Sequence, residues 1–104
     1  MKFGIKDCVW DSLANVFAHF PNIKRALLFG SRAKGNYKPF SDIDIALVGP
    51  SLCIKDILRL QTEIDDLLLP YEFDFCIYDH IENAELKDHI DRRGIEIYSR
   101  KEMV

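Results

Sequence analysis

A Gly-Ser pair, followed at a set distance by an Asp-x-Asp triplet, is the feature that most constrains this chain. Ten residues separate Ser31, which follows Gly30, from Asp42, and Asp44 then opens an apolar run. Side chains alternate along a β-strand, so Asp42 and Asp44 point to the same side of it. A glycine-containing turn before a helix can hold phosphate, and paired carboxylates can hold a divalent metal ion. The stretch 29–47 therefore indicates chemistry on a nucleoside triphosphate.

Hydrophobic periodicity divides the chain into alternating helices and strands. Helical spacing of apolar residues predicts helices over residues 7–20, 52–69 and 83–93, with a single helical turn over 31–34. Apolar runs and alternating patterns predict strands over residues 23–29, 42–48, 72–78 and 95–98. This order predicts an α/β (α+β) fold, in which helices pack on a small mixed β-sheet. The 104 residues suit a single domain over 1–104.

The predicted helix over residues 52–69 has a wide apolar arc. Its Ile and Leu side chains follow a helical period, and Leu60 broadens the arc that they form. A helix that covers a sheet needs only one apolar face. We therefore expect part of this helix to face a partner rather than the core.

Charge and composition exclude several classes of protein. A net charge of -3 and a pI near 5.5 argue against a broad nucleic-acid-binding surface, so nucleic acid is not an expected partner. No apolar run approaches the ~20 residues of a membrane-spanning helix, and the N-terminus lacks the apolar stretch of a signal peptide. We therefore expect no membrane association and a cytoplasmic location. Cys8, Cys53 and Cys76 form no Cys-x-x-Cys pair, so we expect small buried side chains rather than disulfides or a zinc site.

A third carboxylate, Asp74, lies in the predicted strand over 72–78. If this strand neighbours the one that carries Asp42 and Asp44, three negative charges meet at one end of the sheet. Such a cluster is unfavourable without a cation, and its hard oxygen ligands select Mg²⁺, with Mn²⁺ as an alternative. The competing interpretation is an acidic edge strand, because charged residues protect sheet edges from aggregation.

The Gly-Ser turn supplies groups that suit an anion. Gly30 permits close approach of the backbone, and the N–H groups of Ser31 and Arg32 would point from a helix N-terminus toward phosphate. Arg32, Lys34 and Lys38 add positive charge nearby. The competing interpretation is an ordinary turn followed by solvated loop charges. The conjunction with the aspartates favours a nucleotide-binding turn made of Gly30, Ser31 and Arg32.

The three histidines show no spacing typical of metal ligands. His19 lies on the polar face of the first predicted helix, and His80 and His89 follow the third predicted strand. We expect ordinary surface or structural roles for all three.

At these residues the chain resembles the nucleotidyltransferase superfamily that includes DNA polymerase β and the aminoglycoside nucleotidyltransferases. The signature is Gly-Ser, a spacer, Asp-x-Asp and a later acidic residue, which here are Gly30-Ser31, Asp42-Ile43-Asp44 and Asp74. The compact form of this signature is similar to that of the minimal nucleotidyltransferase (MNT) proteins. The resemblance implies the nucleotidyltransferase fold, with Mg²⁺ on the three aspartates and the triphosphate on the turn.

The resemblance also implies an activity and a partner. We expect a Mg²⁺-dependent enzyme that transfers a nucleoside monophosphate from ATP or another NTP to a hydroxyl group. AMP is the nucleotide that we expect it to transfer. Minimal members pair with a helical HEPN protein, and several act as antitoxins that adenylylate a tyrosine of the HEPN toxin. Two Mg²⁺ ions are implied, both held by Asp42 and Asp44, and one also by Asp74, which would accept the proton of the hydroxyl.

Two alternative functions stay open at this point. The chain could be an antitoxin or complex subunit that binds nucleotide and partner without catalysis. It could also be a transferase of the aminoglycoside type, with a small-molecule acceptor and a pocket completed by a partner subunit. Homo-oligomers and hetero-oligomers are both compatible with the sequence. Template-directed polymerisation is not expected, because the chain lacks a basic groove.

Overall fold

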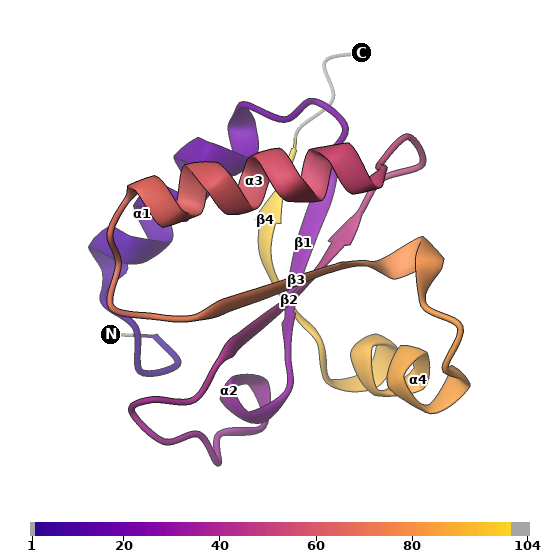
Figure 1. Cartoon of the computed structure of the whole chain (residues 1–104). Coiled ribbons are helices and arrows are strands. Elements are labelled where there is room, and N and C mark those ends of the chain that lie inside the picture. The colour runs from indigo at the N-terminus through magenta and orange to yellow at the C-terminus, as the bar shows by residue number, and fades with distance from the viewer. Residues whose placement is uncertain (1, 101–104) are drawn as a thin grey trace.

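The computed structural model describes residues 2–100 of the chain (Figure 1). The helices are α1 (Asp7–Ala18), α2 (Ser31–Lys34), α3 (Ile54–Asp66) and α4 (Ala84–Arg93), with a short 3-10 helix η1 (Tyr78–His80). The strands are β1 (Arg25–Phe29), β2 (Ile43–Val48), β3 (Phe73–Ile77) and β4 (Ile95–Ser99). Each helix and strand predicted from the periodicity is present, with its ends shifted slightly.

Within residues 2–100, the strands form one four-stranded sheet in the order β3-β2-β1-β4. Strand β1 runs antiparallel to both β2 and β4, whereas β2 runs parallel to β3. Helix α3 connects the parallel pair, because parallel neighbours need a crossover connection. The predicted α+β fold with a small mixed sheet is confirmed.

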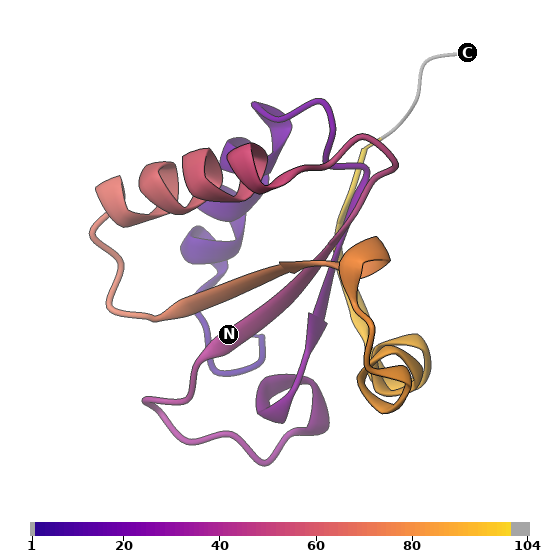
Figure 2. The same ribbon diagram turned by 45° about the vertical axis from the view of Figure 1, so that its right-hand side comes forward.

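Helices cover both faces of the sheet. Figure 2 shows α1 and α3 on one side of the strands and α4 on the other. The odd-numbered residues of β2 belong to the core under α1 and α3, whereas Ala46 packs with Ile90 of α4. This alternation is the one predicted for residues 42–48. It places Asp44, two residues before Ala46, on the face that α4 covers.

Helix α3 buries only part of its apolar surface. It ends at Asp66, short of the predicted boundary, because Leu68 adopts a φ of 53° in the left-handed region. Leu60 is fully buried, whereas Ile54 and Leu58 are each 62% exposed. Part of the helix therefore faces away from the core, as predicted. The outward-facing apolar residues are Ile54 and Leu58, however, and Leu60 belongs to the core.

The prediction that the cysteines are buried is wrong. Cys8 and Cys53 are exposed, Cys76 is half-buried, and all three are free thiols. Cys8 lies on the outer face of α1, between the buried positions of that helix. Cys53 is the N-cap of α3, where its backbone N–H donates to the Asp56 carboxylate at 3.1 Å. Their exposure follows from these local positions, which override the general tendency of cysteine to be buried.

Among the helices within residues 2–100, none combines the length and the apolar character needed to span a bilayer. The cytoplasmic location stays a prediction.

Candidate active site

Strand β1 ends in a turn that is pressed against a carboxylate. Gly30 follows β1 with φ 76° and ψ -153°, a backbone conformation that favours glycine. A Cβ on residue 30 would collide with Oδ2 of Asp44. This proximity follows from the strand register, because Phe29 pairs with Asp44 across β1 and β2. The Gly30-Ser31 turn therefore lies directly beside Asp44.

Three aspartates gather at this end of the sheet. Asp44 and Asp74 are register partners on the parallel strands β2 and β3, so their Cα atoms are roughly 5 Å apart. Asp42 lies in the segment just before β2. Burial raises the pKa of Asp44, and the charges of Asp74 and Asp42 raise this pKa further. The structure thus brings together the three carboxylates that the sequence singled out.

These carboxylates form an open cluster rather than a closed metal cage. Among residues 2–100, no three His, Cys, Asp or Glu side chains have the mutual spacing of a metal site. The pKa of Asp44 nevertheless responds to both other aspartates, so the charges lie close enough to interact. Mg²⁺ commonly binds one or two carboxylates together with water and substrate phosphates, which suits an open set of oxygen ligands. The donor chemistry therefore fits Mg²⁺ that arrives with a triphosphate.

Ser31, Lys34 and Lys38 occupy the positions expected for them. Ser31 is the first residue of α2 and is half-buried, and the first N–H groups of a helix have no partner within it. Lys34 and Lys38 are exposed on α2 and the loop after it. Ser31 can thus offer its amide and hydroxyl to an anion, while the two lysines remain solvated charges.

Arg32, predicted to bind nucleotide, has a side chain with a structural role. This side chain is only 1% exposed. Its guanidinium donates hydrogen bonds to the carbonyl oxygens of Phe3 and Ser41, each at 2.9 Å, and lies 5.0 Å from the ring centre of Tyr37. A guanidinium enclosed in this way is not available to phosphate. The prediction is wrong for the side chain, and only the backbone N–H of Arg32 stays a candidate.

Cys76 lies near the acidic cluster but is not an activated nucleophile. Burial, with the charges of Asp74 and Asp44 adding to it, raises the pKa of the Cys76 thiol to about 11. The thiol is therefore protonated at neutral pH, and a protonated thiol is a poor nucleophile and a poor metal ligand.

His89 lies beside the turn, although the sequence predicts only a surface or structural role for it. Its Nε2 accepts a hydrogen bond from the backbone N–H of Gly30 at 3.3 Å. Its ring meets that of Phe29 edge-on, with ring centres 6.4 Å apart. His19 and His80 are exposed, as expected. No spacing in the sequence links positions 30 and 89, so only the packing of α4 on β1 reveals this contact.

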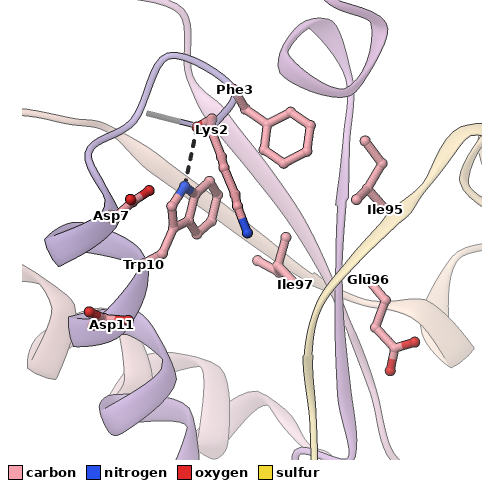
Figure 3. Close-up of a pocket in the computed structure, with 8 residues that line it drawn as sticks. All are labelled: Lys2, Phe3, Asp7, Trp10, Asp11, Ile95, Glu96 and Ile97. Carbon is pink, nitrogen blue, oxygen red and sulfur yellow. Dashed lines mark hydrogen bonds between the residues drawn. The ribbon is translucent and has the colours of Figure 1, made fainter.

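A cavity of about 670 Å³ lies elsewhere, between the N-terminal loop, α1 and the edge strand β4 (Figure 3). Phe3 and Trp10 form an edge-on aromatic pair there, and the indole N–H of Trp10 donates to the carbonyl of Lys2 at 3.2 Å. Ile97 of β4 lines the opposite side. None of the predicted site residues lines this cavity. Asp42 and Asp74 are exposed, so the candidate active site faces solvent beside the turn.

Two sequence comparisons agree on the family of the chain. The family model described as "Polymerase beta, Nucleotidyltransferase" matches residues 11–103, a range that contains every predicted site residue. A protein from Methanocaldococcus jannaschii, named as an inferred protein adenylyltransferase, is 36% identical over 76 residues. The match covers 72% of this chain and 80% of that protein.

Solved structures share the fold. A chain in the structure of a toxin-antitoxin with AMP-PNP superposes with a TM-score of 0.70 at 19% identity, covering 93% of this chain and 76% of that one. A chain in the structure of a tri-AMPylated HEPN toxin in complex with an MNT antitoxin, from Shewanella oneidensis, gives a TM-score of 0.67 at 16% identity. That match covers 92% of this chain and 74% of the other. At these identities the likeness concerns the fold alone.

The structural role of Arg32 is testable by replacing it with methionine. Arg32→Met keeps an apolar stem but leaves buried carbonyl oxygens without donors, so we expect a loss of about 2–4 kcal/mol in the free energy of unfolding. Urea denaturation measures this loss. Lys34→Met, in the same helical turn, is the control and should change stability by less than about 0.5 kcal/mol. Equal stability of the two variants would contradict the structural role.

The raised pKa of Asp44 predicts a stability effect in the metal-free protein. A carboxyl group whose pKa is raised by folding opposes folding when it ionises. This penalty is absent below the pKa of the unfolded chain and present above that of the folded protein, so Asp44→Asn should raise the Tm at neutral pH. Thermal unfolding in EDTA measures the difference, which should shrink toward about pH 4. Asp11→Asn, an exposed change on α1, is the control, and a lower Tm for Asp44→Asn than for this control would contradict the expectation.

Proposed function

The chain belongs to the polymerase beta nucleotidyltransferase family, and from this membership we propose that it transfers AMP from ATP to a hydroxyl group of a partner protein. It is a nucleotidyltransferase; the nucleotide, the metal ion and the acceptor are the proposed parts. One observation carries them: the Gly30-Ser31 turn lies against Asp44, whose register partner is Asp74. A phosphate-binding turn and a carboxylate cluster thus share one open surface.

Each site residue has a proposed role. Asp42, Asp44 and Asp74 would hold Mg²⁺, as two ions, and Ser31 would bind the terminal phosphates through its amide and hydroxyl. Bound there, Mg²⁺ would neutralise charge on the phosphates and acidify the acceptor hydroxyl. Burial raises the pKa of Asp44, and repulsion by Asp74 and Asp42 raises it further. A bound cation would relieve this repulsion, which supports the assignment.

The proposed reaction is an in-line displacement at phosphorus. The acceptor oxygen forms a bond to the α-phosphorus, the bond from that phosphorus to the bridging oxygen of the β-phosphate breaks, and pyrophosphate leaves. Asp74 would take the proton of the acceptor, since it is exposed on the edge strand β3 and thus accessible to a second molecule. His89 is less suited to this role, because its Nε2 already accepts the N–H of Gly30.

We propose a tyrosine of a helical HEPN protein as the acceptor. The relative that shares 36% identity is named for protein adenylylation. The structure named for an AMPylated HEPN toxin with an MNT antitoxin shares the fold of this chain. Both support a protein acceptor over an aminoglycoside-type small molecule, and both favour AMP over other nucleotides. An antitoxin that only binds its toxin remains the second candidate, since these neighbours are complexes.

Intact-mass measurement separates transfer from binding. The wild-type protein, incubated with ATP, Mg²⁺ and a HEPN partner, should add whole adenylyl units to the partner. Asp42→Asn and Asp44→Asn should each lower this rate by about 100-fold or more, because charge stabilisation at the phosphates is lost. EDTA should have the same effect on the wild-type protein.

Asp11→Asn, far from the turn on α1, is the matched control and should transfer AMP at the wild-type rate. Undiminished transfer by both site variants would contradict the proposed mechanism. Formation of a stable complex without any gain in mass would instead establish the binding-only antitoxin.

The outer face of α3 is our candidate for the partner contact. Ile54 and Leu58 lie one helical turn apart on it, each 62% exposed. A groove of about 280 Å³ continues from Ile54 toward β3 and is lined by Ile57 and Ile77. An exposed apolar stripe beside an apolar groove is typical of a surface that binds another protein. The helical partner proposed above would place an apolar helix face there.

Leu58→Asp tests this surface. The substitution should weaken complex formation by about tenfold or more, because it puts a charge into an apolar contact, while the Tm stays close to that of the wild type since Leu58 is exposed. Isothermal titration with the HEPN partner measures the affinity. Asn15→Asp, an exposed change of equal charge on α1, should leave the affinity unchanged. Equal affinity of both variants would exclude α3 from the interface.

A further inference from the structure

Helix α4 reaches the candidate active site through a single side chain. His89 accepts the backbone N–H of Gly30 at 3.3 Å, although 59 positions separate the two residues. The imidazole ring also meets the edge of the Phe29 ring, the last residue of β1. The histidine thus contacts both the end of the strand and the first residue of the turn.

The direction of the hydrogen bond makes Nε2 of His89 the acceptor and the backbone N–H of Gly30 the donor. A ring nitrogen that accepts an N–H carries no proton, so this contact requires an unprotonated Nε2. Gly30 is then enclosed on two sides. Its amide is held by His89, and its Cα lies against the carboxylate of Asp44. The position of the turn relative to Asp44 therefore depends on α4 as well as on the sheet.

Packing and an N-cap fix the position of helix α4, and with it the position of His89. Ile90, the next residue after His89, is 1% exposed and packs against the sheet. The helix begins with an N-cap, because the Asn83 side chain accepts the backbone N–H groups of Glu85 and Leu86 at 2.9 and 3.1 Å. A packed and capped helix restricts where the imidazole can lie.

We propose that His89 is a positioning residue for the nucleotidyl transfer proposed above, on which this inference rests. Its imidazole accepts the N–H of Gly30 and so keeps the Gly30-Ser31 turn in its position beside Asp44. In the proposed mechanism Ser31 of the turn would hold the triphosphate, and Asp44 would hold the metal ion. His89 itself contacts neither of them, and acts through the backbone of Gly30.

A pair of polar substitutions tests the hydrogen bond directly. In His89→Gln the amide oxygen can reach the place of Nε2, whereas in His89→Asn the shorter side chain cannot. The first readout is hydrogen exchange of the Gly30 amide, followed by NMR in the absence of nucleotide. We expect protection in the wild type and in His89→Gln, and loss of protection in His89→Asn. His80→Asn, an exposed histidine on η1, is the control.

The second readout is kinetic and separates positioning from general stability. Loss of the hydrogen bond should raise the KM for ATP about three- to tenfold in His89→Asn, with a smaller change in kcat. His89→Gln should recover most of this loss. A merely structural role would lower the Tm of both variants without the recovery of KM by glutamine.

Each outcome decides the proposal. Equal protection of the Gly30 amide in all variants would overturn it, as would equal KM values for His89→Gln and His89→Asn. If His89→Asn does not fold, His89→Leu, which lacks an acceptor but fills the site, takes its place. If the wild-type protein transfers no AMP, the proposed function fails, but the exchange experiment still establishes whether His89 holds the turn.

Discussion

The antiparallel register between β1 and β2 is the constraint on which the site depends. It sets Phe29 opposite Asp44, so the residue after Phe29 must turn away within contact distance of a carboxylate. Glycine suits this approach, because a Cβ on residue 30 would collide with Oδ2 of Asp44 and the φ of 76° is unfavourable for other residues. A slip of one residue would move Asp44 to the face covered by α1 and α3. Such a slip would also expose the buried apolar residues of β2, and the free-energy cost of that exposure stabilises the observed register.

The parallel pairing of β2 with β3 adds the second half of the site. It places Asp74 beside Asp44 at an edge of the sheet, where a large acceptor can approach. Partial burial disfavours the ionised form of Asp44, and repulsion by the neighbouring carboxylates disfavours it further. The sheet thus keeps an unfavourable charge cluster that a core of apolar residues on the opposite face must offset. Such a compromise is typical of functional sites, which tolerate local instability.

The parts of this structure that sequence reasoning predicted are those that follow from short periods. Alternation assigned Asp42 and Asp44 to one face of their strand, and helical spacing located α1, α3 and α4. That Asp74 joins them depended on the pairing of β2 with β3, which only the structure gives. Two features that the sequence did not predict, the burial of Arg32 and the contact of His89 with the turn, depend on contacts between distant segments. Arg32 looks like a phosphate ligand because of its charge, but backbone carbonyls of two separate segments surround it. His89 lies beside Gly30 only because α4 packs on β1, and no local pattern encodes that contact.

Arg32 joins two segments that are far apart in the sequence. Its guanidinium holds the carbonyl of Phe3 near the N-terminus and the carbonyls of Pro39 and Ser41, just ahead of Asp42. Arg32 therefore links the loop before Asp42 to the segment around Phe3. A fusion tag or crosslink that displaces Phe3 would remove one contact of Arg32 and make the loop before Asp42 more mobile. The position of Asp42 would then change, so the placement of such attachments affects the activity of the purified protein.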